Sequence, residues 1–350
     1  MSQILFNNPL YQEDLRNILN LEINFDKLSN SKILITGATG LIGTVLVDQL
    51  DFINKEKKLN LELYLVSRNA TSCISHFTYI KDTKLHVIEQ DIKCPLLTNV
   101  KFDFVIHAAS NTHPKLYSTD PVGSLTTNLI GTYNILSKMA ENNSGRFVLI
   151  SSVEIYGDDT VKKEGGFTET DFGYLDCNTV RANYCEGKRS SESLCQAFLS
   201  QYGVDCVIPR LCRCYGPSLK KDDSKAVSQF LRNGLEKKDI VLKSKGNQFF
   251  SYLYASDAVN AILLTMLNGQ KGNAYNVADK KSDITLYNLS KLIADFAGTK
   301  VVLDIPDESE AKGFSKAVTA ILNPDKLKSL GWRAFYPIEE GIKRTLSMLV

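Results

Sequence analysis

The chain has 350 residues, 43% of them hydrophobic and 23% charged, which is enough apolar material for one large domain or two closely packed ones. Its 41 lysines and arginines nearly balance 39 aspartates and glutamates, and the net charge of +2 argues against a nucleic-acid-binding surface. No apolar stretch approaches the ~20 residues of a membrane-spanning helix, and the polar N-terminal segment does not resemble a secretory signal. We therefore expect a cytoplasmic protein with no membrane or nucleic-acid partner.

Cysteine and histidine spacing gives no sign of a metal site. The eight cysteines contain no CxxC pair, and the four histidines complete no zinc-binding spacing. We therefore predict no bound metal, and free thiols fit a reducing compartment best.

The predicted elements begin with an extension, residues 1–30, that contains an amphipathic helix at about 11–21 and should pack on the main domain. From residue 31 onward, short apolar runs alternate with amphipathic helices. The expected strands are 33–36, 61–66, 85–88, 104–107, 146–151 and 206–210, and the expected helices start near 41, 122 and 183. This alternation predicts a doubly wound α/β fold of the Rossmann type over residues 31–210, with a parallel sheet covered on both faces.

The pattern becomes irregular beyond residue 210. A Gly/Pro turn, a charged loop at 220–225 and a helix at about 228–236 precede another strand and two helices after residue 276. Together with the loop at 158–180, we expect residues 211–350 to form mainly a smaller α/β substrate-binding domain. It should cover the carboxyl edge of the sheet, where ligands bind in such folds.

A glycine-rich turn follows the first predicted strand and opens the first helix. It comprises Gly37, Ala38, Thr39, Gly40, Leu41, Ile42 and Gly43. Glycines allow the sharp turn, the close approach of backbone to a pyrophosphate, and the packing of the helix on its strand. The helix N-terminus offers free N–H groups to the phosphates. In this strand–turn–helix context the motif predicts a dinucleotide-binding site.

The end of the second strand bears on the choice of nicotinamide cofactor. A carboxylate there would bind the ribose hydroxyls of NAD and repel a 2′-phosphate. This chain has Ser67, Arg68 and Asn69 instead. Because Arg68 can pair with a 2′-phosphate and its neighbours can hydrogen-bond it, we favour NADP over NAD. The alternative is a solvated arginine beside a site that does not discriminate.

Two further strand ends should lie against the cofactor. Asp91 and Ile92 follow the third strand and are placed to meet the adenine. Ala108, Ala109 and Ser110 follow the fourth, where small side chains let the cofactor lie close to the backbone.

Three residues form a candidate catalytic set. Tyr184 and Lys188 are four positions apart on a predicted helix and so share a face. A lysine ammonium and a positive nicotinamide ring both favour the phenolate, so a tyrosine that ordinarily titrates near ~10 can act as a general base. Ser152 ends the fifth strand and can hold the substrate oxygen whose proton Tyr184 removes.

These features resemble the extended short-chain dehydrogenases/reductases of the nucleotide-sugar epimerase/dehydratase family, over roughly residues 32–345. The matching stretches are GATGLIG at 37–43, HAAS at 107–110, TTNLIGTYNIL at 126–136, SSVEIYG at 151–157, NYCEGKR at 183–189, RLCRCYGP at 210–217, YASDAVNAI at 254–262, NAYNVA at 273–278 and LGW at 330–332. Within the family the chain looks most similar to the UDP-glucuronate decarboxylases.

The resemblance implies an activity, a cofactor and an assembly. Enzymes of this family oxidise a sugar hydroxyl with tightly held NAD(P), act on the resulting ketone and often return the hydride. It also implies that Asn128 contributes to the cofactor site and that the chain forms a homodimer through the helices near 122–141 and 183–202.

The chain departs from the family pattern at three positions. The 4,6-dehydratases carry Asp-Glu where this chain has Val153 and Glu154, so a base is retained and the acid for the leaving hydroxyl is lost. Phe250 stands where the family usually has an arginine that touches the substrate diphosphate, and Arg213 replaces an asparagine. We expect Ser152, Glu154, Arg213 and Phe250 to meet the substrate, with Arg213 either replacing the missing arginine or marking an unusual substrate.

Four functions remain open from the sequence. The first is an epimerase-type enzyme in which Tyr184 deprotonates a sugar hydroxyl and the transient ketone is reduced or rearranged. The second is a lyase on the same scaffold, a decarboxylase or 4,6-dehydratase, using Glu154; the loss of the family's aspartate and arginine counts against it, so we favour the epimerase. The third is a keto-sugar reductase that releases oxidised cofactor. The fourth, a non-catalytic dinucleotide sensor, is disfavoured by the intact catalytic set.

Overall fold

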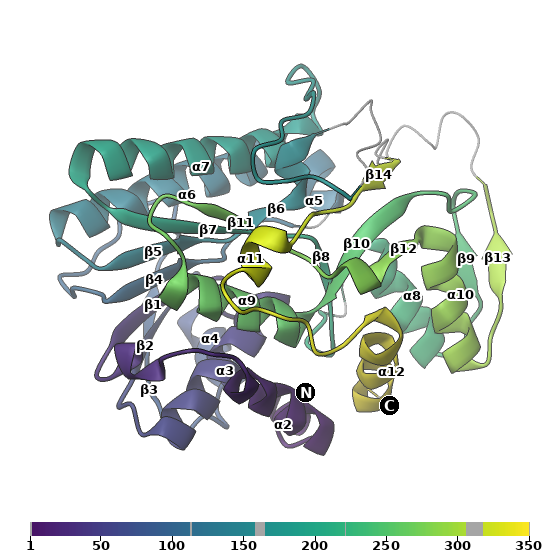
Figure 1. Ribbon diagram of the computed structural model, residues 1–350, viewed down its shortest axis with the longest axis horizontal. Helices are drawn as coiled ribbons and strands as arrows, with labels where there is room; N and C mark the ends of the chain where they lie inside the picture. The colour runs from purple at the N-terminus through teal and green to yellow at the C-terminus, as the bar shows by residue number, and fades with distance from the viewer. Residues whose placement is uncertain (1, 113, 158–164, 221, 306–317, 350) are drawn as a thin grey trace.

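A parallel β-sheet with helices on both faces lies at the centre of the computed structural model, which describes residues 2–112, 114–157, 165–220, 222–305 and 318–349 (Figure 1). The strand order is β11 (Ala274–Val277), β7 (Asp205–Leu211), β5 (Arg146–Leu149), β4 (Phe104–His107), β1 (Lys32–Thr36), β2 (Glu62–Ser67) and β3 (Lys84–Glu89), and β6 (Ser151–Ser152) also pairs with β7. The expected α/β fold is therefore confirmed.

The strand order reverses at β1, which pairs with β2 on one side and β4 on the other. Residues of β1 such as Ile33 and Ile35 are fully buried, as expected for a strand covered by helices on both faces. The register places Thr36 beside His107 at the carboxyl ends of β1 and β4. Ligands of open parallel sheets bind in the crevice at such a reversal point.

Helices cover the sheet in two layers (Figure 1). On one face α3 (Leu41–Lys57) packs against α9 (Ala255–Asn268), whose residues from Ala255 to Leu267 are all buried. On the other face α6 (Pro121–Glu141) packs along α7 (Ala182–Tyr202). Two shorter helices, α4 (Ala70–His76) and α5 (Pro114–Thr119), follow β2 and β4 along the chain. No helix among the described residues is long and apolar enough to span a membrane.

A smaller unit adjoins the carboxyl edge of the large sheet. Its four-stranded sheet contains β12 (Asp283–Thr285), β10 (Phe249–Tyr254), β14 (Thr319–Ala320) and β8 (Arg213–Tyr215), and β9 (Ile240–Leu242) pairs separately with β13 (Val301–Leu303). Its helices are α8 (Ala226–Leu235), α10 (Leu286–Ala297) and α12 (Ile338–Leu349), and the short α11 (Asp325–Lys328) lies near β11.

The expected boundary at residue 210 does not coincide with the edge of the large sheet. Both α9 and β11 come later in the chain, yet they belong to the large layer, because β11 pairs in parallel with β7. After β11 the described residues contain three short strands and three α-helices, more than the one strand and two helices expected. These strands have two or three residues each, too few for a periodic pattern to be visible. Part of the expected lid loop, residues 158–164, lies outside the described residues.

The N-terminal extension is fastened to the C-terminal helix. Instead of one helix at 11–21 it forms α1 (Ser2–Phe6), α2 (Pro9–Arg16), which Asn8 caps, and two 3-10 helices (Asn17–Asn20 and Phe25–Leu28). Asp14 of α2 accepts hydrogen bonds from Arg344 of α12 at 2.6 Å and from Tyr254 at 2.6 Å. Burial raises the pKa of Asp14 to about 6, although both partners oppose that rise.

Removing the arginine from this buried pair should destabilise the fold. An Arg344→Met substitution leaves the Asp14 carboxylate buried without its cation, and we expect a loss of about 3 kcal/mol in the free energy of unfolding, measured with urea. The double variant Asp14→Asn/Arg344→Met should recover part of that loss. Glu13→Gln removes the exposed partner of the same arginine and should change little. Equal stability of the single variant and the wild type would contradict this assignment.

Candidate active site

A single cavity of about 1260 Å³ runs along the carboxyl edge of the large sheet and under the smaller unit. Its lining contains nearly all of the residues expected to bind ligands: Gly37, Thr39, Gly40, Leu41, Ile42, Gly43, Ser67, Arg68, Asn69, Asp91, Ile92, Ala108, Ala109, Ser110, Ser152, Glu154, Tyr184, Lys188, Arg213 and Phe250. The fold thus brings together groups that are spread over more than two hundred positions of the sequence.

The glycine turn fits a bound pyrophosphate. Gly37 has φ +72°, and a Cβ there would lie 2.7 Å from the backbone of Ala108. At Gly43 a Cβ would lie 2.1 Å from the Gly37 carbonyl oxygen. Gly40 is the N-cap of α3, and a Cβ there would meet only the Gly37 carbonyl oxygen, at 3.3 Å. The cap is therefore free of side chains on its cavity side, and the first turn of α3 can offer its N–H groups to phosphate oxygens.

At the end of β2, Arg68 is the side chain most available to a ligand. Asn69 caps α4, with its Oδ1 accepting from Ser72 N at 2.8 Å, and Ser67 Oγ bonds the backbone of Asn69. Both neighbours of Arg68 thus hold the turn, and the arginine itself is exposed at the cavity wall.

Polar side chains fix the segment after β4. Thr36 Oγ1 lies 2.7 Å from His107 Nδ1 and accepts from Ala109 N at 3.1 Å, which joins the ends of β1 and β4. Ser110 Oγ donates to Asn128 Oδ1 at 2.9 Å. Asn128 is buried and is not part of the cavity lining, so it acts on the cavity through Ser110.

The three residues of the catalytic set meet at one wall of the cavity. Tyr184 and Lys188 lie on successive turns of α7, and Ser152 ends β6. Lys188 is buried, and its Nζ donates to the Ile150 carbonyl oxygen at 2.8 Å. Burial lowers the pKa of Lys188 to about 8, which leaves the ammonium mostly protonated at pH 7.

The protein groups around Tyr184 act on its pKa in opposite directions. The phenol is buried, which raises its pKa above the ordinary value, and a hydrogen bond with Ser152 opposes the rise only in part. The Lys188 ammonium, one helical turn away, donates to the Ile150 carbonyl oxygen.

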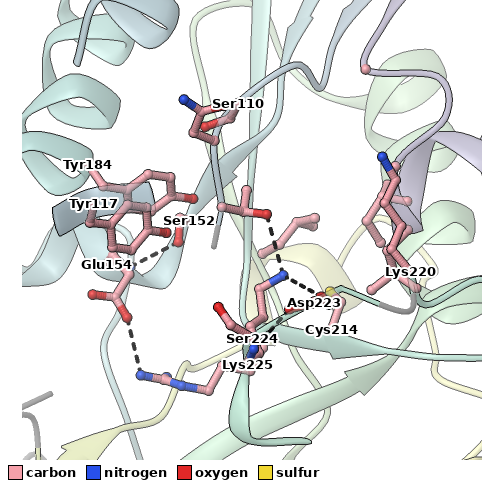
Figure 2. Close-up of a pocket in the computed structure, with 18 of the residues that line it drawn as sticks. Ser110, Tyr117, Ser152, Glu154, Tyr184, Cys214, Lys220, Asp223, Ser224 and Lys225 are labelled. Carbon is pink, nitrogen blue, oxygen red and sulfur yellow. Dashed lines mark hydrogen bonds and ion pairs between the residues drawn. The ribbon is translucent and has the colours of Figure 1, made fainter. Parts of the chain in front are cut away.

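Tyr117 is a site residue that the sequence did not reveal. Its ring stacks on that of Tyr184, with centroids 4.9 Å apart and planes 23° from parallel, and both rings point towards Ser152 (Figure 2). Asn183 Nδ2 donates to the Tyr117 carbonyl oxygen at 2.9 Å and so ties α5 to α7. Tyr117 lies in no motif, and only the packing of α5 against the site identifies it.

Two of the departures from the family pattern, Arg213 and Phe250, form one contiguous group with the retained Glu154. Arg213 Nη2 lies 3.2 Å from Glu154 Oε1, and the Arg213 guanidinium carbon lies 3.7 Å from the centroid of the Phe250 ring. Strands β8 and β10 are neighbours, with Arg213 in register with Tyr252, which brings the arginine over Phe250. Glu154 is joined to the catalytic set, since its N–H donates to Ser152 Oγ at 3.2 Å.

A buried ionic network joins β6, the strand that ends at Ser152, to β7 and α7. Arg210 Nη2 and Glu192 Oε2 are 2.7 Å apart, and Ser151 Oγ donates to Glu192 Oε1 at 2.5 Å. Arg210 Nη1 also donates to the Tyr156 hydroxyl at 2.9 Å. The network links β6, β7 and α7, which keeps Ser152 and Lys188 in a fixed relation.

A lysine connects the two units across the cavity. Lys225 Nζ lies 3.4 Å from Thr112 Oγ1 of the large unit and 3.3 Å from Asp223 Oδ2 of the smaller one (Figure 2). From the sequence we expected only a charged loop at 220–225.

Comparisons with known proteins agree with this architecture. The model of the NAD dependent epimerase/dehydratase family matches residues 33–278. The UDP-glucuronic acid decarboxylase 1 of Xenopus tropicalis is 30% identical over 316 residues, which cover 90% of this chain and 71% of that protein. The UDP-glucuronic acid decarboxylase 6 of Arabidopsis thaliana is 29% identical over 323 residues, which cover 90% of this chain and 87% of that one.

Solved structures share the fold. A UDP-glucose 4-epimerase from Thermotoga maritima aligns with a TM-score of 0.77 and 23% identity, over 91% of this chain and 98% of the other. A dTDP-glucose 4,6-dehydratase from Streptomyces venezuelae, with NAD bound, gives a TM-score of 0.77 and 23% identity over 91% and 96% of the two chains. At this level of identity the likeness concerns the fold.

The family resemblance seen in the motifs is therefore confirmed by a match that extends over most of the chain. The chain is an enzyme of the extended short-chain dehydrogenase/reductase type and belongs to the NAD-dependent epimerase/dehydratase family.

Proposed function

We propose that the enzyme oxidises a hydroxyl of a nucleotide-linked sugar acid to a transient ketone, with Tyr184 as the base. The observation that carries the proposal is the meeting of Ser152, Tyr184 and Lys188 beside the glycine cradle in one cavity. When bound, the nicotinamide would accept the hydride and later return it.

The roles follow from the positions of the side chains. Ser152 Oγ holds the substrate hydroxyl, and Tyr184 Oη removes its proton as the hydride leaves the same carbon. Since burial raises the pKa of Tyr184, the phenolate needs nearby positive charge, for which the protonated Lys188 is the available protein group. The stacked ring of Tyr117 shields one side of the phenol from water.

The fate of the ketone is proposed from the relatives. Two of them carry the name UDP-glucuronic acid decarboxylase and match 90% of this chain. A ketone two carbons from a carboxylate makes carbon dioxide loss easy, because the electrons of the breaking C–C bond pass into the carbonyl as an enolate. Protonation of the carbon that has lost carbon dioxide would regenerate the ketone. Return of the hydride to the carbonyl carbon would then restore the alcohol. Val153 supplies no acid for a leaving hydroxyl, which argues against dehydration.

Product mass tests this proposal directly. Incubation with UDP-glucuronic acid and NAD or NADP should yield a nucleotide sugar lighter by one carbon dioxide, detected by mass spectrometry. Tyr184→Phe should slow the reaction about 10²- to 10⁴-fold, because the general base is lost. The exposed Tyr202→Phe serves as the matched control and should react at the wild-type rate. A new isomer of unchanged mass would instead identify an epimerase, and no reaction with any nucleotide sugar would refute the proposal.

We also propose that the cofactor is NADP in preference to NAD. Arg68 is exposed at the cavity wall at the end of β2, where its guanidinium can pair with a 2′-phosphate. Ser67, Arg68 and Asn69 bring no carboxylate that would repel the phosphate.

Replacing this arginine should change the cofactor preference. Arg68→Ala should weaken NADP binding about tenfold and NAD binding much less, because only NADP has the 2′-phosphate. Titration of each cofactor by nicotinamide fluorescence, using the reduced forms, measures the two dissociation constants. Lys81→Ala, which removes an exposed cation before β3 and outside the cavity lining, is the control. Equal weakening of both cofactors by Arg68→Ala would count against NADP selectivity.

We further propose that two copies of the chain associate through α6. Three apolar side chains on this helix are exposed, namely Val122, Ile130 and Tyr133. Their spacing places them on one face, next to α7, since Tyr133 packs edge-on against Phe198. An apolar helix face of this kind fits a self-complementary dimer contact.

A charge on this face should separate the copies. Tyr133→Glu should shift the mass measured by light scattering after size-exclusion chromatography from that of a dimer to that of a monomer. The control Leu97→Glu places the same charge at a more exposed apolar residue away from α6 and should leave the mass unchanged. A wild-type protein that elutes as a monomer would refute the dimer.

A reducing compartment such as the cytoplasm is the proposed setting. All eight cysteines are described and all are free thiols. Free thiols persist where glutathione and thioredoxin keep them reduced.

A further inference from the structure

Arg213 has more hydrogen-bond donors than the protein satisfies. A guanidinium carries five N–H donors, and Arg213 uses Nη2 towards Glu154. Its Nη1 is buried and has no acceptor among the described residues. A buried donor of a charged group is costly when it lacks an acceptor. Because Arg213 lines the cavity, these donors indicate an anionic ligand group.

Phe250 holds the guanidinium in a fixed plane. The Phe250 side chain is buried beneath Arg213, whose guanidinium carbon is 3.7 Å from the ring centroid. Stacking on a ring covers one face of a guanidinium and leaves its edges free for hydrogen bonds in its plane. The edge that carries the donors can then bind both oxygens of a carboxylate in a bidentate fork.

The position of Glu154 indicates where a ligand carboxylate would lie. Its carboxylate meets Arg213 through a single hydrogen bond of 3.2 Å, a weaker contact than a bidentate fork. Its backbone N–H is bonded to Ser152, the residue that faces the reacting hydroxyl. A carboxylate bound by Arg213 therefore belongs to the sugar ring near the reacting carbon, and not to a phosphate farther along the substrate.

We infer that Arg213, supported by Phe250, is the specificity-determining residue that binds the carboxylate of the substrate sugar, and that Glu154 occupies its place until the substrate arrives. The inference rests on the proposed function and names the residue that selects a sugar acid over a neutral sugar. Displacement by the substrate frees the Glu154 carboxylate to face the sugar beside Ser152. Arg213 acts on binding more than on rate, since a carboxylate loses its charge as carbon dioxide leaves.

Binding to a protein that cannot turn over tests the inference. In the Tyr184→Phe background, saturated with whichever of NADP and NAD binds more tightly, calorimetry compares UDP-glucuronic acid with UDP-glucose, which lacks the carboxylate but keeps the diphosphate. Adding Arg213→Gln should weaken the binding of UDP-glucuronic acid about 10- to 100-fold and the binding of UDP-glucose less than about twofold. Retained UDP-glucose binding also shows that the variant is folded. Arg213→Lys keeps the charge and loses the planar fork. Its affinity for UDP-glucuronic acid should lie between that of the parent and that of Arg213→Gln.

Two further variants separate the roles within the group. Glu154→Gln should bind UDP-glucuronic acid more tightly than the parent, because the competing charge is gone. Lys245→Gln removes another cation that lines the same cavity, on the segment after β9, and should not change the ratio of the two affinities. In the active enzyme Arg213→Gln should raise KM for UDP-glucuronic acid with a much smaller effect on kcat.

Different outcomes would overturn the inference and the proposed function. If Arg213→Gln weakens both ligands equally, Arg213 binds the diphosphate and the inference is wrong. If Glu154→Gln weakens the binding of UDP-glucuronic acid as much as Arg213→Gln does, Glu154 does not compete with the substrate carboxylate for Arg213. If the parent protein binds neither ligand, the proposed function falls and the inference falls with it; binding of both with an unchanged ratio in Arg213→Gln refutes the inference alone.

Discussion

The in-register pairing of β1 with β4 brings the two halves of the site to one edge, and a threonine fixes that arrangement. Thr36 Oγ1 bonds both the His107 ring and the Ala109 N–H, so the glycine turn and the segment after β4 are joined at their origin. The turn can approach that segment only because Gly37 has no Cβ. If the pairing slipped by one residue, the cradle and the catalytic strand would no longer face the same crevice.

The smaller unit is held against this edge by elements that return to the large sheet. Strand β10 leads directly into the buried helix α9, and β11 then adds to β7. Tyr254, at the junction of β10 and α9, bonds Asp14, which also pairs with Arg344. The N-terminal and C-terminal helices thus fix the place where the smaller unit joins the large layer. Phe250, four residues before Tyr254, receives its position from the same connection.

Charge is distributed unevenly around the reacting position. Below the catalytic strand, Arg210 and Glu192 form a short, buried ion pair whose acceptors and donors are largely used, so this pair is structural. At the cavity wall, Arg213 and Glu154 form a longer ion pair, and the buried Arg213 Nη1 has no acceptor among the described residues. The donors of Arg210 have acceptors within the protein, so Arg210 stabilises the fold. Arg213 has donors without acceptors among the described residues, so it is available to a ligand.

Local spacing was enough to predict the parallel α/β sheet, the glycine turn and the grouping of Ser152, Tyr184 and Lys188, because apolar runs, glycines around a turn and a four-residue helical step are all local patterns. The sequence also singled out Arg213 and Phe250 as departures and Glu154 as a retained base, but not that the three touch. Their contact is set by the pairing of β8 with β10. Likewise, the stacking of Tyr117 on Tyr184 and the placement of β11 in the large sheet join distant segments. Such contacts join segments far apart in the chain, and they are visible only once the elements are packed, because no local pattern encodes them.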